Sequence, residues 1–385
     1  GSAKVSITAG ANLIDRDTMG DSEIDITASS LLLNLTGAIG TTTNHIETDI
    51  TTLSVKANGI YITETNGATV DSVTVNVNSV NTQGTTNTTT HTAQEFLQSS
   101  DKLILVANAG DINITSGATL STTNNTLLSA TAGAITLASN ITNGGNLSIN
   151  AATTFTQSAN ITSSGTVDVL AGSVAMGAIF KTTAAENIGY EATNALILGE
   201  LITTKDVTLN AATITNNLGN TSPFYNITAD ELKITAESFG VSTKHIKTNV
   251  ATLSANITAG SLFVSEKDNL TIGQTSAIAV NRVDTEANIT AQTAILQNNL
   301  NTTAHAIVVA TGAITLEATN GGISAGGNIL LKSNILTTNA NIVSSSGNIT
   351  LETQSNININ ADITSSATSK NIDIFSTSGN ITMSD

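Results

Sequence analysis

A five-residue pattern recurs along this chain: a glycine, any residue, an apolar residue, a residue that is usually polar, and a second apolar residue. Apolar residues at alternate positions are typical of a short strand with one buried face. The chain shows no helical periodicity of comparable strength, so the pattern predicts an all-β fold. It begins at Gly110, Gly133, Gly145, Gly165, Gly312, Gly327, Gly347 and Gly379.

The spacing of the pattern indicates how the strands are arranged. Gly145 and Gly165 are 20 residues apart, as are Gly327 and Gly347, and this length suits one turn of a β-solenoid. One turn cannot bury its own apolar face, whereas stacked turns bury inward Ile, Val and Leu in a continuous core. We therefore expect an elongated rod, a right-handed parallel β-helix (β-solenoid) of roughly nineteen turns.

The sequence also has a longer repeat, with a period of about 200 residues, that contains many of the 20-residue turns. Residues 40–54 match residues 240–254 at an offset of 200, and residues 145–149 match residues 347–351 at an offset of 202. The register predicts a first repeat unit at 4–205 and a truncated second unit at 206–385, in one continuous rod, with residues 1–3 as a cloning remnant. We expect a segment of a longer tandem array that continues into further units; an isolated duplicated domain is the alternative.

Composition excludes several classes of function. The net charge is −16 with only 13 basic residues, which argues against nucleic acid and against anionic membrane surfaces as partners. No apolar run is long enough to span a membrane, so we expect no membrane insertion. The recurrence of Ile, Val and Leu argues against disorder, despite the many Ser, Thr and Asn residues.

Segments such as GAITL, GNLSI and GTVDV, interleaved with ADELKITAES, VSTKHIKTNVATLSA and GIYITE, resemble the repeats of large bacterial adhesins related to filamentous haemagglutinin. The resemblance covers nearly the whole chain. It implies a β-helix shaft on the bacterial outer surface or in the extracellular space. It also implies a partner surface, host, neighbouring-cell or abiotic, reached through an unknown receptor.

Four histidines are present, and only His45 and His245 occupy equivalent positions in the two repeat units; the others are His91 and His305. Many turns would separate the equivalent pair, so we do not expect them to share a metal, and we expect turn or surface roles. A Gly-x-Ser-x-Gly match at Gly322–Gly326 is followed by a strand pattern where a nucleophile elbow needs a helix. We expect no catalytic residues and no bound cofactor.

A weak calcium site is the one metal hypothesis. Spaced carboxylates around Gly20 could supply oxygen ligands, although the spacing fails the EF-hand pattern and the matching stretch at 216–226 has lost the acids. A solvated loop is the preferred interpretation. The candidate ligands are Asp15, Asp17, Asp21, Glu23 and Asp25.

These observations favour a non-catalytic shaft segment of a secreted or cell-surface bacterial adhesin, which acts as a structural spacer, adheres to surfaces, or does both. A polysaccharide lyase-like β-helix enzyme is an alternative, but Arg16 and Arg282 are the only arginines and aromatic residues are scarce. An ice- or mineral-surface binder with flat Thr arrays is a second alternative, although the turn spacing varies. Insertions near 81–97 and again near 298–305 are expected to protrude as loops, and 81–97 is the predicted place for any specific binding.

Overall fold

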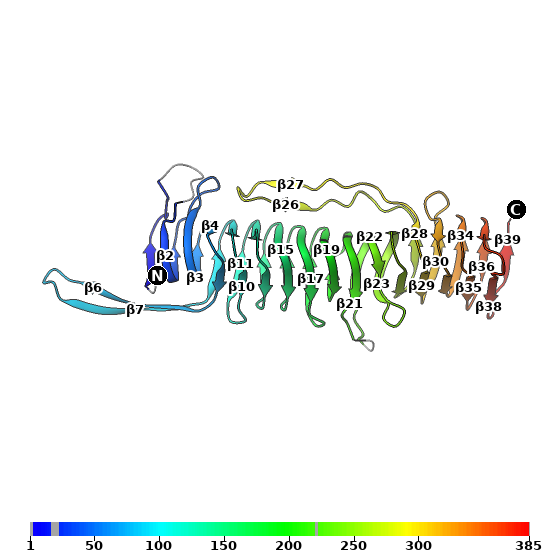
Figure 1. Cartoon of the computed structure of the whole chain (residues 1–385), viewed down its shortest axis with the longest axis horizontal. Helices are drawn as coiled ribbons and strands as arrows, with labels where there is room; N and C mark the ends of the chain where they lie inside the picture. The colour runs from blue at the N-terminus through cyan, green and yellow to red at the C-terminus, as the bar shows by residue number, and fades with distance from the viewer. Residues whose placement is uncertain (1–2, 17–22, 220–221, 385) are drawn as a thin grey trace. The chain divides into compact units, whose positions relative to one another are not determined.

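The protein is described here by a computed structural model that covers residues 3–16, 23–219 and 222–384. Those residues form strands and turns and no helix, and the chain winds as a parallel β-solenoid of about 17 turns (Figure 1). The all-β class and the parallel solenoid are therefore confirmed. Handedness and the single continuous rod stay predictions. The described part of the chain contains no helix of the length and apolarity that crossing a membrane requires.

The contacts divide the chain into two compact units. The first comprises residues 1–174 together with residues 281–291, and the second comprises residues 175–280 and 292–385. This division concerns contacts in space, so the repeat boundaries expected at 4–205 and 206–385 stay predictions.

The first sixteen strands all belong to the first unit. They are β1 (Lys4–Ala9), β2 (Ile26–Leu35), β3 (Ile46–Ala57), β4 (Ile60–Glu64), β5 (Ala68–Val70), β6 (Val73–Val80), β7 (Thr86–Gln94), β8 (Phe96–Ser99), β9 (Leu103–Ala107), β10 (Ile112–Ile114), β11 (Thr119–Thr122), β12 (Thr126–Ala130), β13 (Ile135–Leu137), β14 (Ile141–Asn143), β15 (Leu147–Gln157) and β16 (Ile161–Ser163).

The remaining strands follow in chain order, and two of them, β26 and β27, lie within residues 281–291. They are β17 (Val167–Met176), β18 (Lys181–Ala184), β19 (Ile188–Leu198), β20 (Glu200–Ile202), β21 (Val207–Asn216), β22 (Ile227–Phe239), β23 (Ile246–Ile257), β24 (Leu262–Glu266), β25 (Leu270–Ile272), β26 (Asn281–Val283), β27 (Ile289–Ala291), β28 (Leu300–Thr302), β29 (Ala306–Ala310), β30 (Ala313–Leu316), β31 (Ile323–Ala325), β32 (Ile329–Ser333), β33 (Ile335–Thr338), β34 (Ile342–Ser344), β35 (Ile349–Thr353), β36 (Ile357–Ile359), β37 (Ile363–Ser365), β38 (Ile372–Ser376) and β39 (Ile381–Met383).

The core consists of inward apolar side chains stacked from one turn to the next. In the first unit, Leu128 pairs in register with Leu105 on one side and Ile149 on the other, and all three are buried. In the second unit, Val308 pairs with Leu331 in the same way. Adjacent parallel strands place equivalent side chains directly above one another, so the period-two pattern produces a continuous apolar column.

The glycine of the pattern is required because consecutive turns stack backbone on backbone. A Cβ atom on Gly347 would lie 2.2 Å from the carbonyl carbon of Gly327, and one on Gly165 would lie 2.6 Å from the carbonyl oxygen of Gly145. Contacts this short do not occur, so only glycine fits. The 20-residue glycine spacing thus reports the length of one turn.

The asparagine that often follows the glycine has a different function. The side-chain oxygen of Asn328 accepts a hydrogen bond from the backbone N–H of Asn348 at 2.8 Å, and that of Asn348 accepts one from the N–H of Asn371 at 3.0 Å. Each side chain satisfies a backbone donor of the next turn, where no ladder partner is available. The frequent Gly-Asn pairs are thereby explained.

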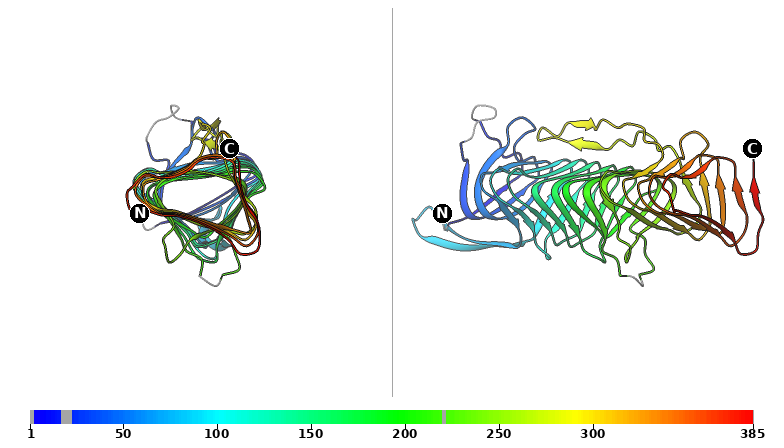
Figure 2. Two further views of the ribbon diagram at one scale, coloured as in Figure 1. Left: turned by 90° about the vertical axis from the view of Figure 1, so that its right-hand side faces the viewer. Right: turned by 45° about the vertical axis from the view of Figure 1, so that its right-hand side comes forward.

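Two antiparallel hairpins leave the solenoid wall. The first contains β6 and β7, and Figure 2 shows it projecting beyond the first strands of the chain. It overlaps the insertion predicted at 81–97, although Phe96–Ser99 already belongs to the wall as β8. The second contains β26 and β27, and its base is the antiparallel bridge between Thr275 and Gln297.

The prediction of a protruding loop at residues 298–305 is therefore wrong, because the second hairpin ends before residue 298. Within the predicted range 298–305, strand β28 is part of the wall and pairs with β23 and β31. The polar residues Asn298 and Asn299 are the turn that precedes a buried strand. They do not form the loop itself, which ends at Gln297, where the backbone pairs with Thr275.

Candidate functional site

The tip of the second hairpin, residues 281–291, lies on the outer face of the first unit (Figure 1). Val283 and Ala287 are 1% and 3% exposed, and they pack in one apolar cluster with four outward-facing side chains of the wall. We call these four the tip-binding surface: Tyr61 on β4, Ile104 and Val106 on β9, and Leu127 on β12.

The burial of the wall strands reflects this cover. Side chains of a strand point alternately inward and outward, so a strand with one solvated face alternates between buried and exposed residues. Strands β9 and β12 are instead buried at every position. The hairpin tip supplies the second apolar layer.

Polar contacts fix the tip along the same outward column. Arg282 donates from Nε to Asp168 at 2.6 Å and from Nη2 at 3.1 Å. The backbone N–H of Val283 donates to the hydroxyl of Ser148 at 2.8 Å. The bidentate geometry fixes both the position and the orientation of the guanidinium.

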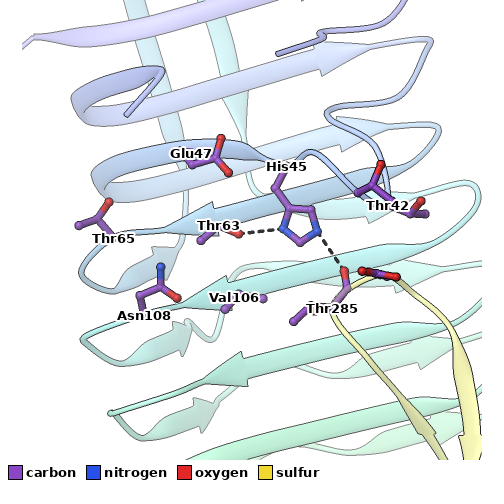
Figure 3. A pocket seen from close by; sticks show the side chains of 10 residues that line it. Thr42, His45, Glu47, Thr63, Thr65, Val106, Asn108 and Thr285 are labelled. Atoms are coloured by element: carbon purple, nitrogen blue, oxygen red, sulfur yellow. Dashed lines mark hydrogen bonds between the residues drawn. The ribbon is translucent and has the colours of Figure 1, made fainter. Parts of the chain in front are cut away.

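His45 contacts the end of the tip (Figure 3). Its Nε2 lies 3.0 Å from the carbonyl oxygen of Thr285, and its Nδ1 lies 2.8 Å from the hydroxyl of Thr63. A carbonyl only accepts, so Nε2 carries the proton and the neutral ring accepts from Thr63 at Nδ1. Burial lowers the pKa of His45, and the hydrogen bond to Thr285 partly opposes that shift. The neutral imidazole is thus favoured.

A polar cavity of about 410 Å³ lies beside His45, between the wall and the tip (Figure 3). Hydroxyl groups dominate its lining, with carboxylates from Glu47 and Glu286 and the amide of Asn108. Such a lining offers hydrogen-bond donors and acceptors, while both nitrogens of the imidazole are already engaged. The arrangement serves to position the tip.

The other histidines lie apart from this cavity. His305 accepts a hydrogen bond at Nδ1 from the backbone N–H of Asn328 at 3.0 Å, so it takes the place of an asparagine in the turn ladder. His91 lies on β7. His245 is the counterpart of His45; its ring lies 5.5 Å from that of Phe263, as His45 lies 6.1 Å from Tyr61.

The acidic region falls partly outside the described residues, because Asp17 and Asp21 are not among them. Of the remaining candidates, Asp15 and Asp25 come together with Glu47 of the following turn. One carboxylate oxygen from each lies within 4.8 Å of the others, and no second group of three acidic or histidine side chains is this close in the described part of the chain.

Sequence reasoning missed Glu47 and included Glu23, which is not in that group. The backbone N–H of Glu47 donates to Asp25 at 3.0 Å, across 22 residues of chain. That separation is about one turn, so the turn length was the signal that could have identified Glu47. Three carboxylates could contribute oxygen ligands to Ca²⁺, which takes six to eight. Calcium stays a prediction.

The second repeat unit differs at these positions. Asn226 accepts from the backbone N–H of Lys247 at 3.0 Å, as Asp25 does from Glu47. The Lys247 ammonium donates to the carbonyl of Ser222 at 2.6 Å. A positive side chain here replaces an acidic one, which shows that the turn itself does not require carboxylates.

Glu64 and Glu266 are equivalent buried glutamates. Glu64 is 0% exposed, and its carboxylate accepts from the backbone N–H of Ile50 at 3.1 Å; Glu266 accepts from that of Val250 at 3.2 Å. Burial raises the pKa of both groups, and these hydrogen bonds partly oppose the shift. Their role is to satisfy backbone donors inside the solenoid corner.

The Gly-x-Ser-x-Gly match has no elbow geometry. Ser324 lies within β31, and the next element along the chain is another wall strand, β32. A nucleophile elbow places its serine on a sharp turn from a strand into a helix.

No family model, no curated protein and no solved structure matches the chain significantly.

Proposed function

We propose that the chain is a non-catalytic shaft segment of a secreted or cell-surface bacterial adhesin, similar in design to filamentous haemagglutinin-like repeats. In this role it spaces an adhesive part from the cell and contacts surfaces along its length. The parent protein would carry further units and would reach a host, neighbouring-cell or abiotic surface through its receptor.

One observation carries this proposal: the design of one repeat unit recurs in the other down to its hairpin. Gln94 at the base of the first hairpin donates to the carbonyl of Leu33 at 3.0 Å, and Gln297 of the second hairpin donates to that of Ile234 at 2.9 Å. Repeating units suit a spacer, because length grows with the number of units while each unit contacts mainly its neighbours.

The chemistry of the described residues also supports a structural role. The buried acids Glu64 and Glu266 hold backbone N–H groups, and His45 holds the hairpin tip through Thr285. These titratable groups act within the fold itself.

The test places the full chain between a cell-surface anchor and a terminal epitope on bacteria. A matched variant carries an additional copy of residues 4–205 joined in register before residue 4. Antibody-coated beads too large to enter the surface layer should bind the longer variant best and the anchor-epitope control least. Equal binding by all three would contradict the shaft. So would release of unsaturated products from polygalacturonate, or thermal hysteresis, by the purified chain.

A further inference from the structure

The two hairpins have the same tip. In the second, the Asp284 side chain accepts from the N–H groups of Glu286 and Asn288 at 2.9 and 2.8 Å. In the first, the Asn81 side chain accepts from those of Gln83 and Thr85 at 3.0 and 3.1 Å.

The backbone of the two tips also agrees. Gly84 has φ 76° and Ala287 has φ 60°, so each tip contains one left-handed residue at the same place. Val80 directly precedes the tip turn in the first hairpin, and Val283 does so in the second. Val80 and Val283 are therefore equivalent.

The equivalent valines differ completely in their surroundings. Val283 is 1% exposed on the tip-binding surface, whereas Val80 is 71% exposed. The base of the first hairpin packs on the wall, where Val73 and Val75 cluster with Leu32, but Val80 at its far end lies in solvent, where two strands alone have little to stabilise them. Among the described residues, the first hairpin therefore carries the contact residue of the second hairpin with no apolar surface against it.

The second unit contains a surface that resembles the tip-binding surface of the first unit. Register pairing of Phe263 with Ile307, and of Ile307 with Leu330, reproduces the pairing of Tyr61, Ile104 and Leu127 in the first unit. With Val309, these residues form a second copy of the tip-binding surface: Phe263, Ile307, Val309 and Leu330.

This second surface is uncovered. Strands β24 and β29 alternate between buried and partly exposed positions, and Phe263, Ile307, Val309 and Leu330 are all partly exposed. A column of four apolar side chains facing water is unusual in a chain whose outward positions are mostly Thr, Ser and Asn. It matches in position and character the surface that Val283 covers in the first unit.

The polar partners of a bound tip are present as well. His245 stands beside Phe263 as His45 stands beside Tyr61. Its ring bonds to the backbone of Val264 in the single chain, and in the proposed contact it would turn to donate to the carbonyl of Thr82. Thr350 pairs with Leu330 as Ser148 pairs with Leu127, and so offers a hydroxyl to the N–H of Val80.

We propose that the first hairpin of one chain binds the column Phe263, Ile307, Val309 and Leu330 of a second copy, by the contacts that residues 281–291 make in the first unit. The contact joins two different surfaces, so it is heterologous and generates head-to-tail assemblies. It goes beyond the shaft role, because it specifies how two copies of this chain join.

The first hairpin has no counterpart of the ion pair between Arg282 and Asp168. Ser79 occupies the position of Arg282, while Asp373, which pairs with Thr350 and is exposed, occupies that of Asp168. The natural contact is thus weaker than the internal one. Ser79→Arg should restore the ion pair and strengthen association roughly tenfold, as a charge-assisted bond does.

Cross-linking tests the geometry directly, because the chain contains no cysteine. Chains carrying Val80→Cys and Leu330→Cys, with tags of different size, are mixed under mild oxidant. The mixed disulfide of Val80→Cys with Leu330→Cys should form at least several-fold faster than that of Val80→Cys with Thr193→Cys, an exposed position outside the proposed surface. If Val80→Cys forms a disulfide with Leu330→Cys and with Thr193→Cys at equal rates, the proposal is overturned.

Sedimentation velocity of the full chain gives the second test. Self-association should increase with concentration, increase further in Ser79→Arg, and be lost in Val80→Asp and in Val309→Asp. Val80 and Val309 face solvent wholly or partly, so both variants should keep the wild-type circular dichroism spectrum and melting temperature. Association that is unchanged in Val80→Asp, or absent even in Ser79→Arg, would refute the proposal.

Discussion

Arg282 donates two hydrogen bonds to the carboxylate of Asp168, at 2.6 and 3.1 Å, across 114 residues of chain. Asp168 is 5% exposed at its side chain, and Arg282 is 33% exposed. A carboxylate so far removed from water needs a partner, and this one obtains it from a hairpin tip that returns to the wall of the first unit.

Arg282→Met should therefore release the tip. Because it leaves Asp168 without its cation, we expect the free energy of opening residues 281–291 to fall by about 1–3 kcal/mol. Hydrogen exchange at the Val283 amide reports that opening. Lys332→Met is the matched control, since the Lys332–Glu352 pair is 50% and 36% exposed and should contribute less than about 1 kcal/mol. Equal costs would show that burial of Asp168 is unimportant.

Val283→Ala should also loosen the tip, because it removes two buried methyl groups from the apolar cluster. We expect a loss of about 1–3 kcal/mol in the free energy of opening, read from the same exchange experiment. Val80→Ala, at the equivalent exposed position, should change the monomer by less than about 0.5 kcal/mol. A larger effect of Val80→Ala in dilute monomer would mean that the first hairpin is covered within its own chain.

The buried glutamates predict a pH dependence of stability. Burial raises the folded-state pKa of Glu64 and Glu266 above the ordinary value of 4.5, so the folded protein binds these protons more tightly than the unfolded chain. Their contribution is fully present below about pH 4.5 and is lost as the pH rises through the folded-state pKa.

The double variant Glu64→Gln with Glu266→Gln should accordingly lose less stability between pH 5 and pH 8 than the wild type. Urea denaturation across this range measures the difference. Glu191→Gln, the same substitution at an exposed glutamate, is the matched control. A steeper loss in the double variant would reverse the sign assigned here.

Gly347→Ala should destabilise the fold, because the added Cβ would lie 2.2 Å from the carbonyl carbon of Gly327. Overpacking of this kind costs roughly 1–3 kcal/mol or more. Gly10→Ala provides the comparison, since nothing lies within 4 Å of a Cβ there. Urea denaturation should give a lower midpoint for Gly347→Ala than for Gly10→Ala. Similar midpoints for the two variants would mean that the stacked turns move apart easily.

Local pattern was enough to predict the wall of the solenoid. At Gly145, for example, the alternation of Leu147 and Ile149 required a half-buried strand, and the 20-residue spacing required stacking. The number of turns was overestimated, at about nineteen against about 17, because residues in the two hairpins were counted as wall.

The hairpin contacts could not be predicted in the same way. Val80 and Val283 lie in similar local sequences, and only the stacking of distant turns decides that one is exposed and the other buried. The group of Asp15, Asp25 and Glu47 could not be predicted for the same reason. Glu47 approaches Asp25 from the next turn, so the sequence of one loop does not reveal their contact.

The bond between His45 and Thr285 closes a loop of 240 residues. A solenoid held only by neighbouring turns can unravel from an end, one turn after another, under a pulling force. With the tip bound, tension applied beyond residue 285 is shared between the covalent backbone and the hairpin. The larger part of that tension would pass through the hairpin contact, so the contact would have to break before the turns between His45 and Thr285 unravel.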